Sequence, residues 1–69
     1  MGPASALNYA AQHGSVVTIV PADFYDEPVP FTGTVREIPA IPSVYEIRPL
    51  GHGHIHRVMA DDVAEVIFE

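Results

Sequence analysis

Residues 57–66 read Arg-Val-Met-Ala-Asp-Asp-Val-Ala-Glu-Val, and the fold that we expect rests mainly on this pattern. Strand-forming side chains stand on both sides of Ala60-Asp61-Asp62, and aspartate is a residue type that caps short helical turns. We therefore expect a strand over residues 54–59, a single helical turn, and a last strand over residues 66–68. The end of the chain is predicted to be β structure with one helical turn in it.

Three more strand patterns precede this stretch. Each is rich in β-branched or alternating apolar residues and is bounded by proline or glycine, and they cover residues 16–20, 31–38 and 43–48. Gly33 falls inside the second pattern, at a point where a small barrel bends sharply. In the third, Tyr45 and Ile47 face one side while Glu46 and Arg48 face the other. Five short strands at this spacing indicate an all-β fold, a five-stranded antiparallel barrel.

An Ala-rich segment comes before the first strand. Pro3 stands in its first turn and Gly14 just after its end, which is typical of a short helix. Two to three turns are marginally stable in water, so a frayed arm is the alternative. We therefore divide the chain into a helix or arm over residues 1–14 and a barrel domain over residues 15–69, and we expect the barrel not to need residues 1–12.

The order of these parts resembles the SH3-like small β-barrel. The resemblance covers residues 15–68 in topology and is motif-like only over residues 57–66. It implies a fold and no particular function, because many unrelated activities share such folds. Peptide-binding SH3 domains grip polyproline in an aromatic-lined groove, whereas this chain lacks tryptophan and has Asp62 where that family typically carries a groove tyrosine. We therefore do not expect recognition of proline-rich motifs.

Length and composition favour self-association. The chain has 69 residues and no cysteine, so it can form one small domain with neither a disulfide nor a thiolate zinc site. Of its residues 48% are hydrophobic and the mean hydropathy is +0.18, which is more apolar surface than so small a core can cover. We therefore expect a homo-oligomer.

The charge balance is strongly acidic, with nine Asp or Glu residues against three arginines and no lysine, and a net charge of -6. Because three separate arginines release few counterions, we expect no binding to nucleic acid, and we expect a protein partner with a basic surface. The arginines, one in each of the second, third and fourth strands, are expected to set strand register with Glu37 and Glu46. We expect no signal peptide, no membrane span and a cytoplasmic location.

Three histidines, His52, His54 and His56, alternate along one short stretch. On a strand they would project from one face at about 7 Å intervals, which permits Zn²⁺ or another divalent transition metal, although solvated histidines are the commoner reading. If His54, His56 and Val58 face inward, Ile55 and Met59 are exposed, and a bulge near residues 57–58 would avoid this conflict. The metal site is therefore the alternative hypothesis.

The loop after the first strand combines aromatic and acidic side chains between two prolines. Such rigid aromatic anchors with a charged rim favour an interface. The alternative is that its phenylalanines fill the end of the barrel. The candidate partner-binding residues are Asp23, Phe24, Tyr25, Asp26, Glu27 and Phe31.

The leading hypothesis is a small acidic interaction module without enzymatic activity or cofactor, of the regulator or inhibitor type that phages and mobile elements encode. The second is a protein that binds a metal through the histidines, or a metal-dependent enzyme. The third is an oligomeric barrel enzyme, similar to the small plasmid-type dihydrofolate reductases, with its pocket at a symmetry axis. None of the recognised catalytic motifs is present in the sequence, which is why the binding hypothesis leads.

Overall fold

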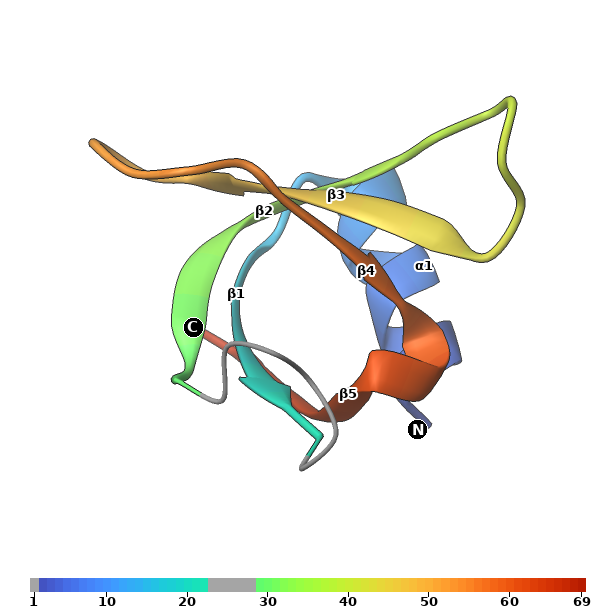
Figure 1. Ribbon diagram of the computed structural model, residues 1–69, viewed down its shortest axis with the longest axis horizontal. Coiled ribbons are helices and arrows are strands. Elements are labelled where there is room, and N and C mark those ends of the chain that lie inside the picture. Colours follow the sequence, from blue (N-terminus) through green and yellow to red (C-terminus); the bar gives the residue numbers. More distant parts are fainter. Residues whose placement is uncertain (1, 23–28) are drawn as a thin grey trace.

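β-branched runs and alternating patterns form one antiparallel sheet of five strands, accompanied by a short helix (Figure 1). The computed structural model describes residues 2–22 and 29–69. In chain order the elements are α1 (Pro3–His13), β1 (Val16–Pro21), β2 (Phe31–Glu37), β3 (Val44–Pro49), β4 (His56–Met59), the 3₁₀ helix η1 (Ala60–Asp62) and β5 (Val63–Phe68). The prediction of five antiparallel strands with one helical turn before the last is confirmed.

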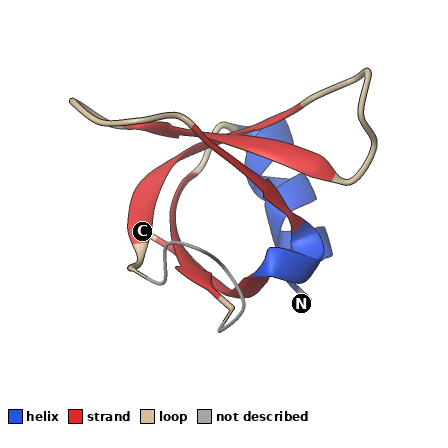
Figure 2. Cartoon of the chain, in the orientation of Figure 1, coloured by secondary structure: helices blue, strands red, loops and turns tan. Residues whose placement is uncertain are grey.

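The strands are hydrogen-bonded in the order β4-β3-β2-β1-β5. β2 belongs to two ladders, since its residues 31–34 pair with β1 and its residues 33–37 pair with β3. Gly33 lies where the ladders overlap, opposite both Val17 and Pro49. A Cβ atom at Gly33 would overlap the carbonyl oxygen of Arg48, so only glycine allows β3 to approach this closely. The sheet curls strongly along its length (Figure 2).

The hydrophobic core lies on the inner side of this curled sheet. Val17 and Ile19 of β1 are fully buried, and they alternate with half-buried residues that face outward. The same alternation places Tyr45 and Ile47 of β3 inside, as the sequence predicts. The buried cluster takes side chains from the helix and all five strands: Leu7, Ala10, Val17, Ile19, Val35, Tyr45, Ile47, Val58 and Val63.

Helix α1 is part of this core. Leu7 and Ala10 are 0% exposed, and the helix lies against β2, β5 and η1. Gly14 ends it in the left-handed conformation, with φ of 64°, and its N–H donates to the carbonyl of Ala10. The segment is therefore a helix and not a frayed arm. The sheet alone would leave the inner side of its strands uncovered, and Leu7 and Ala10 of the helix pack there. Among the described residues no helix has the length and apolarity needed to cross a membrane.

Residues 57–66 form the expected strand, turn and strand, with two shifts in position. The carboxylate of Asp62 accepts a hydrogen bond from the backbone N–H of Met59 at 3.4 Å, and its carbonyl accepts one from Ala22 at 2.9 Å. The first bond closes the turn of η1, and the second ties η1 to the residue after β1. β5 begins at Val63, three residues earlier than predicted, because pairing with β1 continues to Pro21 past an irregularity after Val20.

The prediction that the fourth strand begins at His54 is wrong, since β4 begins at His56. The bulge expected near residues 57–58 is also absent, because Tyr45, Glu46 and Ile47 pair without interruption with Val58, Arg57 and His56. Because His54 lies outside the strand, His56 is the one histidine of the three that shares the inner face of β4 with Val58. Ile55 and Met59 are exposed, at 52% and 47%, as this register requires.

Candidate functional site

A pocket with a volume of about 340 Å³ lies where β2, β3 and the segment before β4 meet. Because Ile47 pairs with His56, and Pro49 pairs with Gly33 of β2, the three strands bring these side chains to one end of the sheet. The lining is mostly aromatic or apolar, and all three clustered histidines belong to it: Phe31, Thr32, Ile47, Pro49, His52, Gly53, His54 and His56.

Phe31 and His56 form one wall of this pocket. Their ring centroids are 4.0 Å apart and the ring planes differ by 14°, so the imidazole is stacked flat on the phenyl ring. Both residues are half-buried, and Phe31 also packs against the core cluster. Stacking of this kind holds the His56 ring in one orientation, because rotation would separate the faces.

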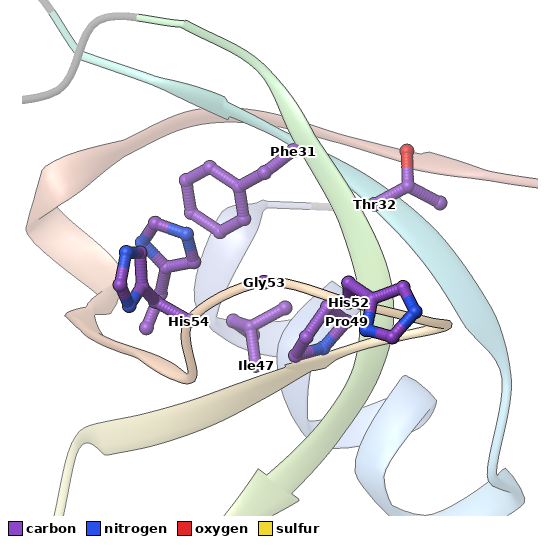
Figure 3. Close-up of a pocket in the computed structure, with 8 residues that line it drawn as sticks. Phe31, Thr32, Ile47, Pro49, His52, Gly53 and His54 are labelled. Carbon is purple, nitrogen blue, oxygen red and sulfur yellow. The ribbon is translucent and has the colours of Figure 1, made fainter.

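His52 and His54 lie in the turn that connects β3 to β4, and both are exposed. Figure 3 shows them on opposite sides of the pocket, with Ile47 and Pro49 between them. Gly53 separates them with φ of 139°, a conformation that favours glycine. The three histidines therefore line one pocket from a turn and a strand end, and not from one strand face as the sequence predicts.

The described residues contain no group of three or more His, Asp or Glu side chains placed to hold a metal ion. His52, His54 and His56 face the same pocket from different sides and do not converge on one point as they stand. Imidazole nitrogens remain suitable ligands for Zn²⁺ and similar ions. Metal binding through these three residues would require the exposed side chains of His52 and His54 to rotate toward His56.

Most of the acidic aromatic loop lies outside the described residues, namely Asp23, Phe24, Tyr25, Asp26 and Glu27. Phe31 is the candidate partner-binding residue that the structure places, at the first position of β2. Ala22, the last described residue before this segment, donates a hydrogen bond from its backbone N–H to the carbonyl of Asp62 in η1. Phe31 therefore belongs to both sets of candidate residues, since it also lines the histidine pocket.

Sequence reasoning missed the apolar floor of the pocket. The sequence pattern places Ile47 in a strand and Pro49 at its end, and nothing in that pattern indicates that either belongs to a site. The alternation of β3 indicates that Ile47 faces inward, but only the pairing of Ile47 with His56 brings it below the histidines. The pairing of Gly33 with Pro49 likewise depends on the bend in β2.

The pocket is suited to binding. The described residues of its lining offer an aromatic ring, an apolar floor and imidazoles that can donate or accept hydrogen bonds, and no carboxylate is among them. The hydroxyl of Thr32 is engaged with that of Thr18 at 2.8 Å. Such a lining fits a flat or apolar group that carries a hydrogen-bonding atom at its edge.

We compared the chain with models of protein families, with curated proteins and with solved structures, and none of the three comparisons finds a match.

Proposed function

We propose that this chain is a small binding module that recognises a protein partner with a basic surface. The pocket of Phe31, Ile47 and the three histidines would receive an apolar or aromatic side chain of the partner. The acidic residues Asp23, Asp26 and Glu27, which precede Phe31 in the sequence, would attract the surrounding basic residues. Binding of this kind needs no cofactor and no reaction.

The observation that carries the proposal is the position of Phe31. This residue ends the acidic aromatic segment of the sequence and, at the same time, forms a wall of the histidine-lined pocket. An aromatic anchor beside a pocket and next to clustered charges is the arrangement from which interfaces draw most of their binding energy. The net charge of -6 adds a long-range attraction for a basic partner.

A pull-down from the native host, with three variants beside the unmodified protein, tests the proposal. Tyr25→Ala combined with Asp26→Asn and Glu27→Gln changes the loop, and His54→Ala changes the pocket. His13→Ala is the matched control, because His13 lies on α1, stacked on Tyr9 and away from the pocket. We expect the loop and pocket variants to lose the same partner, and the control to keep it.

Kinetics with the captured partner separate the two contributions. Loss of the Tyr25 ring should mainly speed dissociation, with affinity lower by about tenfold or more. Neutral loop residues should slow association and flatten its dependence on salt. If the loop and pocket variants capture the same partners as the unmodified protein, the proposal is wrong and the functional surface lies elsewhere.

We also infer that the curled sheet is a closed barrel of the SH3-like kind. In support, β5 returns to pair with β1, and η1 joins the two terminal strands β4 and β5. Val58 of β4 and Val63 of β5 belong to one buried cluster. Methyl contacts between these two side chains in an NMR spectrum are expected for a closed barrel, whereas an open sheet would separate them.

A further inference from the structure

The three arginines of the chain lie together on one face of the sheet. Arg36 of β2 pairs with Glu46 of β3, and Glu46 pairs with Arg57 of β4, so the three side chains form a row across the strands. Arg48 stands two residues beyond Glu46 and therefore projects from the same face. This is the outer face, because Tyr45, Ile47 and Val58 point to the core. We call Arg36, Arg48 and Arg57 the arginine face.

The arginine face gathers the cationic side chains of the chain in one place. It holds all three Lys or Arg residues, and two of them, Arg36 and Arg57, line a hollow together with Glu37 and Glu46. The three arginines with these two glutamates sum to +1, whereas the whole chain, with nine Asp and Glu residues, has a net charge of -6. Cationic side chains gathered in this way make the local potential less negative than the net charge alone would.

Glu46 neutralises only part of this face. Its carboxylate accepts a hydrogen bond from Nε of Arg48 at 3.2 Å, and its side chain is 15% exposed. In residues 2–22 and 29–69 neither Arg36 nor Arg57 forms an ion pair with a carboxylate. A hollow of about 210 Å³ lies between them, lined also by Glu37, Ile38 and Pro39. Two exposed guanidinium groups therefore border a recess without an anionic partner in the described part of the chain.

We propose that the arginine face docks an extended segment of a partner protein that carries at least two carboxylates. Arg36 and Arg57 lie on the strands either side of β3, so their backbones are about 10 Å apart. At this separation each guanidinium can hold its own carboxylate, with two parallel hydrogen bonds. The apolar side chains of Ile38 and Pro39 then contact the peptide between its acidic residues.

Charge argues for a short acidic peptide and against nucleic acid. Three arginines can neutralise very few phosphates, and the remaining acidic surface repels a long polyanion. A segment with two or three carboxylates is short enough to bind across Arg36 and Arg57 alone. This face is on the opposite side of the strands from the Phe31 pocket, so the inference does not depend on the proposed function.

Binding of fluorescein-labelled hexaglutamate, measured by anisotropy at physiological salt, tests the inference. We expect Arg36→Gln with Arg57→Gln to lower the affinity roughly fivefold to tenfold, since exposed pairs contribute modestly. Glu46→Gln should raise it about threefold, because the arginines lose an internal competitor. Glu65→Gln is the matched control, since it removes the same charge from β5, and it should leave the affinity unchanged.

A purely structural role for the arginines gives a different result. If the arginines only set strand register, replacing them would lower the melting temperature of the protein. In that case Glu46→Gln would not raise the affinity for hexaglutamate. Absence of hexaglutamate binding, or equal effects of Glu46→Gln and Glu65→Gln, would overturn the proposal. So would equal or tighter binding of a hexathymidine oligonucleotide, or a fall in the protein's mass on addition of hexaglutamate, which would identify a second copy as the occupant.

Discussion

Gly33 controls how closely two strands of the sheet approach each other. It pairs with Val17 on one side and with Pro49 on the other, and the space that a Cβ would need is taken by the backbone of Arg48. A backbone neighbour cannot rotate away as a side chain can. One missing side chain therefore permits the bend that brings Phe31 of β2 and the turn after β3 to the same pocket.

We predict that Gly33→Ala lowers the free energy of unfolding by about 1–3 kcal/mol, because β2 and β3 must move apart. Gly51→Ala is the control, since nothing lies within 4 Å of a Cβ at that position. Chemical denaturation of both variants measures the difference. If the two substitutions have equal effects, the close approach at Gly33 is of no consequence for stability.

The clustered histidines should bind Zn²⁺ or Ni²⁺ weakly, in the micromolar range or above, and protein purified without chelators should hold no stoichiometric metal. The reason is that His52 and His54 are exposed and must be reoriented before they can share an ion with His56. Elemental analysis and metal titration check this. One tightly held ion per chain, lost in His54→Ala and His56→Ala, would favour the metal hypothesis instead.

At the scale of elements, helix α1 and the strands form one core. The helix contributes Leu7 and Ala10, and Ala11 packs against the same cluster. Its surface-facing Tyr9 contacts Phe68 of β5 edge-on, with ring centroids 5.7 Å apart. A helix of 11 residues is marginal alone, so these contacts hold it in place. The division of the chain at residue 14 remains a prediction, and the packing of Leu7 indicates how to test it.

We predict that Leu7→Ala lowers the free energy of unfolding by about 2–5 kcal/mol, because it leaves a cavity in the core, and lowers the melting temperature by roughly 8 °C or more. Asn8→Ala is the control, since Asn8 is exposed on the same helix. Thermal unfolding followed by circular dichroism measures both. A melting temperature of Leu7→Ala equal to that of Asn8→Ala would mean that the strands are stable without the helix.

At the scale of the whole molecule, a substantial apolar surface stays exposed. Tyr9 and Phe68 form an aromatic pair on the surface at 46% and 41% exposure, with Ile67 next to Phe68 at 42%. Other large apolar side chains are exposed around the molecule: Val29, Ile41, Leu50, Ile55 and Met59. A core of this size cannot cover so many apolar residues, which is the reason to expect self-association.

Light scattering at micromolar concentration should therefore give at least the mass of a dimer. If the aromatic pair contributes to the contact between copies, Phe68→Ser should lower the mass more than Ile41→Ser. Ile41 is the matched control, because its side chain is similarly exposed. High salt should leave the mass unchanged, because burial of apolar surface is not screened. A clean monomer at high concentration would contradict the prediction.

Local sequence patterns are sufficient to predict the secondary-structure elements of this protein. Residues 16–20, 43–48 and 57–66 indicate strands and a turn, because β-branched runs, alternation and proline act over a few residues. Pro3 and Gly14 bound the helix for the same local reason. Strand ends were less well determined, as His54 and Val63 show, because pairing with a neighbouring strand decides where a ladder stops.

Which side chains meet depends on the tertiary structure. Phe31 stacks on His56 because β2 pairs with both β1 and β3, and β4 pairs with β3, and the local sequence around these residues specifies neither pairing. Arg36 and Arg57 share a face with Glu46 for the same reason, although the sequence separates them widely. Strand register fixes such contacts, and register depends on the burial of every strand at once.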